Sequence, residues 1–204
     1  MTYIIFDTET TGLPLYGIDN PADAPYQPRM CSIAAALLDD KGIPTAEFSS
    51  LVKPENWPLE DPRFVANMEQ ARAKAHGLTF ERLMDEGKPI AEIYEQWESL
   101  YSQATYVSAY NVWFDHKIIR VEWKRLGHPI PFREKKALCV MKGARGPCGL
   151  PKNPKLSEAV SILLGRDHVK SHDAKGDLDV TIELFQVLLA ENALLIDEQP
   201  EAKS

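Results

Sequence analysis

The chain has 204 residues, of which 44% are hydrophobic and 26% charged, as in an ordinary globular domain and unlike a disordered or collagenous chain. Its three scattered cysteines exclude a disulfide scaffold and fit a reducing compartment, and the net charge of −7 argues against a broad basic face that binds nucleic acid. No hydrophobic run reaches the roughly 18 residues of a membrane span, and no signal peptide is recognisable, so we expect a soluble cytoplasmic protein without a membrane partner.

Three strands are predicted in the first quarter of the chain. Residues 2–7 form an uninterrupted hydrophobic run that ends in acid, which is typical of a buried central strand. Residues 30–38 and 45–53 are predicted to be strands, and the tight turn between them makes them antiparallel neighbours. Residues 13–29 contain four prolines and are expected to be a loop.

The rest of the chain is mainly helical by its hydrophobic spacing. The predicted elements are a mostly helical stretch at 63–103, a strand at 105–110, and helices at 112–126, 156–164 and 174–190. Residues 133–155 are predicted to be irregular and basic. This order indicates an α/β fold with a mixed sheet in one domain at 1–192, followed by a polar, disordered tail at 193–204.

Asp7 and Glu9 stand at the end of the first predicted strand, in the stretch FDTETTGL. Residues two apart in a strand face the same way, so the two carboxylates project side by side. Close carboxylates raise each other's pKa unless a cation lies between them, and hard divalent ions suit such oxygen ligands. A turn with polar caps is the simpler interpretation of an isolated pair of this kind.

Asp115 and Asp177 are predicted on the inward faces of two helices. Asn111 can cap the helix that carries Asp115, and the hydrophobic residues three and four positions after Asp115 place it on the side that packs on the sheet. A carboxylate there is costly unless it is paired or metal-bound, so a salt bridge is the alternative. Asp177 borders the hydrophobic stripe of the last helix, and His172 lies in the loop before it, where an imidazole can serve as a general base.

Four carboxylates and one histidine from three separate elements favour two-metal phosphoryl transfer. The stretches FDTETTGL (6–13), NVWFD (111–115) and HDAKGD (172–177) resemble the three motifs of DEDD-superfamily exonucleases of the His subtype, relatives of the polymerase proofreading subunit and of RNase T. The resemblance spans residues 3 to 189, and HGLT (76–79) is similar to a stretch that many members carry.

That resemblance implies an RNase H-like fold, a mixed five-stranded sheet with one antiparallel strand, and 3′→5′ hydrolysis of nucleic acid to nucleoside 5′-monophosphates. It implies two divalent ions, Mg²⁺ or Mn²⁺, a general base at His172, and a set of metal ligands formed by Asp7, Glu9, Asp115 and Asp177. It also implies contacts with the terminal nucleotide from a second set of residues, formed by Thr10, Thr11, Gly12, Leu13 and Asn111.

The expected substrate is a single-stranded or frayed 3′ end, with DNA favoured by the likeness to proofreading domains and a polymerase or other replication or repair protein as the expected partner. An exoribonuclease of the RNase T or oligoribonuclease type, or a catalytically dead nucleic-acid-binding module, is the alternative. A haloacid dehalogenase-type phosphatase fits less well, because Glu9 stands where its second aspartate is needed. The long loop at 14–29, the residues Ala109 and Tyr110 before Asn111, and the basic stretch at 133–155 bear on substrate choice.

Overall fold

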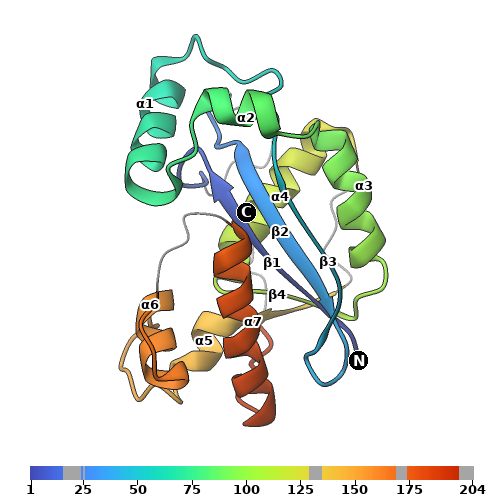
Figure 1. Cartoon of the computed structure of the whole chain (residues 1–204), viewed down its shortest axis with the longest axis vertical. Coiled ribbons are helices and arrows are strands. Elements are labelled where there is room, and N and C mark those ends of the chain that lie inside the picture. The colour runs from blue at the N-terminus through green and yellow to red at the C-terminus, as the bar shows by residue number, and fades with distance from the viewer. Residues whose placement is uncertain (16–23, 25, 129–134, 169–173, 198–204) are drawn as a thin grey trace, which may run out of the picture.

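A five-stranded sheet in the order β3-β2-β1-β4-β5 lies at the centre of the molecule (Figure 1). In this computed structural model, which describes residues 1–15, 24, 26–128, 135–168 and 174–197, β2 (Met30–Leu38) runs antiparallel to β1 (Tyr3–Thr10) and β3 (Pro44–Leu51). On the other side of β1, β4 (Tyr106–Ala109) and β5 (Lys136–Cys139) are parallel to it. The predicted mixed sheet with one antiparallel strand is confirmed.

Two layers of helices enclose this sheet, as Figure 1 shows. The helical elements in chain order are α1 (Pro62–Ala71), the π-helix η2 (Arg72–His76), α2 (Phe80–Glu86), α3 (Ile90–Tyr101), α4 (Val112–Arg125), α5 (Val140–Ala144), α6 (Leu156–Ala159), the π-helix η3 (Val160–Leu164) and α7 (Ala174–Ala190). Helices α3 and α4 share a buried cluster with one face of the sheet, and α5 to α7 share another with the opposite face. None of the helices in the described part of the chain is long and hydrophobic enough to cross a membrane.

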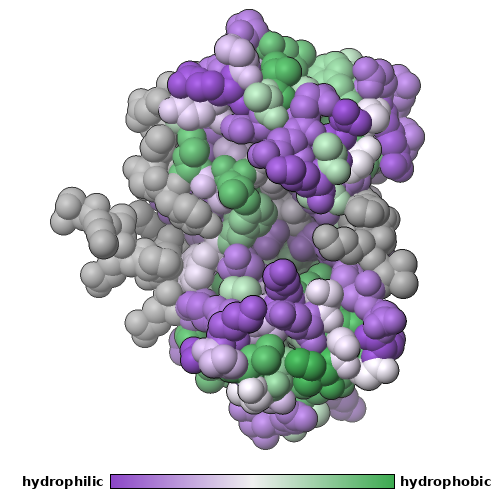
Figure 2. Space-filling view, turned by 90° about the vertical axis from the view of Figure 1, so that its left-hand side faces the viewer, coloured by the Kyte–Doolittle hydropathy of each residue, from purple (hydrophilic) through white to green (hydrophobic). Residues whose placement is uncertain are grey.

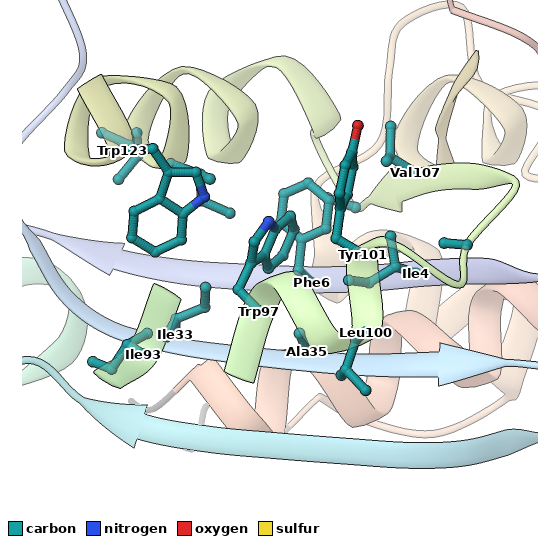
Figure 3. Close-up of a cluster of buried hydrophobic side chains, with 14 of the residues drawn as sticks. Ile4, Phe6, Ile33, Ala35, Ile93, Trp97, Leu100, Tyr101, Val107 and Trp123 are labelled. Atoms are coloured by element: carbon teal, nitrogen blue, oxygen red, sulfur yellow. The ribbon is translucent and has the colours of Figure 1, made fainter. Parts of the chain in front are cut away.

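Strand β1 is buried on both faces, which fixes the position of its C-terminal end. Ile4 and Phe6 point to one face, where the Phe6 ring meets the Trp97 ring edge-on at a centroid distance of 4.9 Å (Figure 3). Tyr3 and Ile5 point to the other face with α7. The period of two along a strand produces this division, and it carries on into the acidic residues that follow.

The prediction of an irregular segment at 133–155 is wrong where β5 and α5 form. The strand covers only four residues, begins with a lysine and runs directly into α5 at Val140, so it offers no alternation or flanking turn that a local pattern could detect. It forms because its backbone pairs with β4, from Tyr106 opposite Lys136 to Ala109 opposite Cys139.

The predicted domain boundary at residue 192 stays a prediction. Within the predicted tail, the backbone N–H of Asp197 donates to the carbonyl of Ala137, and its carboxylate pairs with Lys142 at 2.7 Å. Residues 193–197 therefore continue along β5, and residues 198–204 lie outside the described part of the chain.

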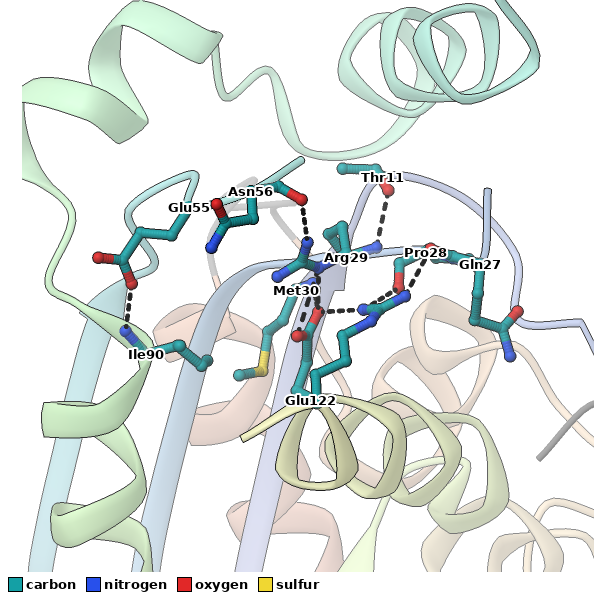
Figure 4. A network of polar contacts seen from close by, with 10 residues as sticks. Thr11, Gln27, Pro28, Arg29, Met30, Glu55, Asn56, Ile90 and Glu122 are labelled. Atoms are coloured by element: carbon teal, nitrogen blue, oxygen red, sulfur yellow. Dashed lines mark hydrogen bonds and ion pairs between the residues drawn. The ribbon is translucent and has the colours of Figure 1, made fainter. Parts of the chain in front are cut away.

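A buried ionic network ties α4 to the beginning of β2 (Figure 4). The side chain of Glu122 is 2% exposed and accepts hydrogen bonds from the Arg29 guanidinium, the Arg125 guanidinium and the backbone N–H of Met30 at 2.9–3.0 Å. Arg29 also donates to the carbonyl of Asn56. One carboxylate thus satisfies donors from two separate segments of the chain.

Replacing Glu122 by alanine should strongly destabilise the protein, because it leaves two largely buried guanidinium groups without their carboxylate. We expect the free energy of unfolding in urea to fall by about 3–5 kcal/mol. Glu122→Gln, which keeps an acceptor for the Met30 N–H, should lose less. The matched control is Glu86→Ala, which breaks an exposed pair with Arg82 and should cost at most about 1 kcal/mol. Equal losses in the two alanine variants would contradict a dominant role for the network.

Candidate active site

Three carboxylates gather at the C-terminal end of β1. Asp7, Glu9 and Asp177 each offer an oxygen atom, and these oxygens lie within 4.8 Å of one another. All three residues are half-buried. The structure thus brings together three of the four predicted ligands, in the one grouping of this kind among the described residues. Their role as metal ligands stays a prediction.

The geometry follows from the alternation along β1 and the position of α7. Tyr3 and Ile5 face α7, so Asp7 and Glu9, continuing the same alternation, project toward that side of the sheet. Asp177 lies in the first turn of α7, where the positive end of the helix dipole favours a negative charge. A strand end and a helix beginning thus bring the three acids together.

Asp115, the fourth predicted ligand, is not part of this group. It lies on α4, which covers the opposite face of the sheet, and it is 5% exposed. Its Oδ1 accepts hydrogen bonds from the backbone N–H and the hydroxyl of Thr8, at 3.0 and 2.8 Å. Thr8 alternates with Asp7 and Glu9 along β1, so its side chain points to the α4 side of the sheet. This orientation explains why Asp115 contacts Thr8.

Burial raises the pKa of Asp115 to about 7, because the ionised carboxylate has lost its hydration. The two hydrogen bonds from Thr8 oppose this shift, and the negative charge of Asp177 adds to it. Asp115 therefore lies within electrostatic range of Asp177, although the oxygens of Asp115 are not part of the acidic group. A cation bound among these acids would favour the ionised form of Asp115.

The metal-free protein should lose stability as pH rises through the pKa of Asp115. An unfolded aspartate titrates near 3.9, so between about pH 4 and pH 7 the folded state holds a proton that the unfolded state releases. The stability due to this group is present below that range and lost above it, at up to about 1.4 kcal/mol for each pH unit. Urea unfolding in a chelator should show this slope, and Asp115→Asn should flatten it. A slope unchanged in the variant would assign it to other groups.

The predicted substrate contacts divide into buried and exposed residues. Thr10 and Thr11 are 6% and 1% exposed, the Thr10 hydroxyl donates to the Gly12 carbonyl, and the Thr11 hydroxyl accepts from the Arg29 N–H. Both hydroxyls therefore shape the turn after β1. Leu13 is 80% exposed. The side of the molecule that carries α1 and α6 shows hydrophobic side chains near its middle, while both of its ends mix hydrophilic and hydrophobic side chains (Figure 2).

Asn111, the remaining predicted contact, is exposed at the start of α4. It occupies the N-cap position, but its side chain makes no capping hydrogen bond, contrary to the sequence-based prediction. The helix begins instead with a backbone hydrogen bond from the Phe114 N–H to the Asn111 carbonyl. The Asn111 amide can therefore face a ligand without giving up a cap.

His76 contacts the C-terminal end of β1, a role that sequence reasoning missed. It is 3% exposed, its Nδ1 accepts from the Leu78 N–H at 3.0 Å, and its Nε2 lies 3.2 Å from the Thr10 carbonyl. Because Nδ1 is an acceptor, Nε2 carries the proton and donates to that carbonyl. The π-helix η2 ends at Gly77 in the left-handed conformation, with φ of 68°, and this distortion presents His76 to Thr10. The HGLT stretch was the available signal.

The predicted general base, His172, lies outside the described residues. The four other histidines have distinct surroundings. His76 is fixed by two hydrogen bonds, burial lowers the pKa of His116 to about 3, and His128 stacks on Tyr94 at 3.7 Å. The Nε2 of His168, by contrast, lies 3.2 Å from the Oδ1 of Asp177. His168 stands four residues before His172 in the chain, and sequence reasoning missed its position beside the acidic group.

Some aromatic and basic side chains that could bind nucleic acid are engaged within the chain. Trp57 is 7% exposed and packs edge-on against Phe64, so it is not available to stack on a base. In the predicted basic stretch, Lys142 pairs with Asp197 and Lys152 lies 3.8 Å from Glu158. Trp57 is therefore part of the core, and the charges of these two lysines are partly offset by carboxylates of the same chain.

The family model for exonucleases of the RNase T type matches residues 4–185. The chain therefore belongs to this exonuclease family, and the resemblance to DEDD exonucleases is confirmed. A comparison with curated proteins finds no match.

Several solved exonuclease structures are similar to the chain. E. coli exonuclease I in complex with a dT13 oligonucleotide matches with a TM-score of 0.69 and 20% identity, over 92% of this chain and 40% of that one. The nuclease domain of 3′hExo, a DEDDh family member bound to rAMP, matches with a TM-score of 0.69 and 18% identity over 98% of this chain and 97% of that one. The likeness confirms the predicted RNase H-like fold. The chain spans about two fifths of the length of exonuclease I.

Proposed function

We propose that the chain is a metal-dependent 3′→5′ exonuclease that releases nucleoside 5′-monophosphates. The observation that carries the proposal is the group of Asp7, Glu9 and Asp177 at the end of the central strand, in a chain of an exonuclease family. Carboxylate oxygens gathered this closely fit hard divalent ions. Pairs of such ions are typical of nucleases and polymerases.

The candidate residues divide in this proposal into ligands of the ions, a general base and contacts with the terminal nucleotide. Asp7, Glu9 and Asp177 would hold two Mg²⁺ or Mn²⁺ ions, and Asp115 would join them once its proton has left. When bound, the ions supply an activated water and stabilise the leaving oxygen. His172 would accept the proton of the attacking water, and Leu13 would contact the terminal nucleotide from the turn that Thr10 and Thr11 shape.

The proposed substrate is the single-stranded or frayed 3′ end of DNA. Support comes from the likeness to E. coli exonuclease I, whose structures hold dT13 and dA16 oligonucleotides. RNA is the second candidate, because the chain is also similar to a 3′-exonuclease that recognises a histone mRNA stem-loop. A polymerase or other replication or repair protein is the proposed partner. The three free, buried cysteines favour the cytoplasm as the place of action.

A substrate with a free 3′ end should be shortened stepwise, and a closed circle should not be cut. The experiment compares a linear single-stranded DNA labelled at its 5′ end, the same sequence as a closed circle, and the same sequence as RNA, each with Mg²⁺ or Mn²⁺. We expect a ladder from the linear DNA and intact circles, with slower digestion of the RNA. Cutting of the circle would contradict an exonuclease, and faster digestion of the RNA would reverse the proposed preference. Binding without products would indicate the catalytically dead module.

Asp7→Asn should abolish most of the activity by removing one ligand of the divalent ions. We expect turnover to fall by several orders of magnitude and the affinity for Mn²⁺, measured by calorimetry, to fall with it. The metal-free variant should melt at a higher temperature than the metal-free wild type, because one of three mutually repelling carboxylates is gone. Asp40→Asn, which removes an equal charge from an exposed turn, is the matched control and should change none of these three quantities. Wild-type protein that binds no divalent ion, even with a nucleoside monophosphate present, would overturn the proposal.

A further inference from the structure

We propose that His168 is a positioning residue for the carboxylate of Asp177. The two side chains approach within 3.2 Å, from His168 Nε2 to Asp177 Oδ1. The His168 side chain is only 4% exposed, whereas that of Asp177 is 28% exposed. The inference rests on the proposed function, since Asp177 matters here as a ligand of the divalent ions.

The contact between His168 and Asp177 follows from the course of residues 165–168 after η3. The π-helix η3 ends at Gly165, whose left-handed φ of 67° turns the backbone away from the helix axis. Arg166 then meets Glu183 of α7, with a nitrogen-oxygen distance of 2.5 Å. Two residues later His168 reaches Asp177, which lies six residues, or about 9 Å, nearer the N-terminus of α7. The segment therefore runs antiparallel to α7 with contacts at both of these points.

A partner on Asp177 has a physical purpose in this group. Asp7, Glu9 and Asp177 carry like charges within 4.8 Å of one another, so repulsion favours rotation of the more exposed carboxylates away from the group. An imidazole nitrogen against one oxygen of Asp177 limits that rotation. A side chain held against a metal ligand orients that ligand, and loss of such a partner commonly weakens metal affinity.

This role differs from the one proposed for His172. A general base touches the reacting water, so its loss lowers turnover and leaves the affinity for the ion nearly unchanged. A positioning residue acts through the ligand that it holds, so its loss changes the affinity for the ion before any nucleic acid is present. The two histidines can therefore be told apart by a measurement that does not depend on activity.

The test compares His168→Gln with His168→Asn. The amide nitrogen of glutamine can reach about as far as the imidazole Nε2, while that of asparagine is shorter by one methylene group. Calorimetry with Mn²⁺ alone should give wild-type affinity within a few-fold for His168→Gln and a loss of about 10–100-fold for His168→Asn. Both variants replace a buried ring by an amide, so their melting temperatures in a chelator report the packing loss that they share.

The control is His172→Ala, for which we expect unchanged Mn²⁺ affinity. Wild-type affinity in both His168 variants, or an equal loss in both, would overturn the positioning role, because neither result depends on the reach of a nitrogen donor. Failure of the wild-type protein to bind Mn²⁺, even with a nucleoside monophosphate present, would instead overturn the proposed function. If His168→Asn does not fold, His168→Ser provides the short polar side chain for the same comparison with His168→Gln.

Discussion

The hydrogen bonds between Thr8 and Asp115 are the constraint on which the site depends. Strand β1 extends beyond its parallel neighbour, since the last pair with β4 joins Ile5 to Ser108. The Thr8 N–H, three residues further on, donates to the Asp115 carboxylate. Asp115 thereby supports the part of β1 that β4 does not reach. In the same stretch of β1, Asp7 and Glu9 point to the opposite side of the sheet. The alternation of side chains along the strand therefore explains both the contact of Thr8 with Asp115 and the position of the two acids.

Helix α4 secures a second strand with a second buried acid. Glu122 follows Asp115 by seven residues, two turns of helix, and so shares its inward face. It binds the Met30 N–H and the Arg29 side chain at the start of β2. The backbone of Arg29 in turn exchanges two hydrogen bonds with Thr11, each of 2.9 Å. Helix α4 therefore contacts the chain on both sides of the turn after β1, and Glu122 is linked to Thr11 through Arg29.

Sequence patterns predicted those elements whose signal is local. The hydrophobic run at 30–38 and the helix at 174–190 match β2 and α7 residue for residue, because a continuous hydrophobic strand and a long amphipathic helix carry their own periodicity. Strand β5 has no such signal, because it is defined by its pairing with β4. The buried position of Trp57 was equally hidden, since its neighbours Phe64 and Phe80 belong to helices whose placement the sequence does not specify.

The site shows the same division between local and tertiary information. The strand period predicts that Asp7 and Glu9 lie side by side, and the helix pattern correctly predicted that Asp115 points inward. Neither pattern says which face of the sheet each helix covers, and that choice separates Asp115 from the acids on the other side of β1. His168 could not be recognised as a neighbour of Asp177, because the contact joins two segments through the tertiary fold and leaves no local pattern in the sequence.

The acidity of the site also links the binding of ions to the binding of substrate. Three carboxylates within 4.8 Å repel a phosphodiester as they repel one another, and the chain as a whole carries a net charge of −7. Lysines that could have offset this charge, such as Lys142 and Lys152, lie beside carboxylates of the same chain. Cations bound among the acids would reverse the sign of the local field, so they favour the substrate, and by thermodynamic reciprocity the substrate favours them. A low affinity for ions in the free protein is thus compatible with a fully loaded site on nucleic acid.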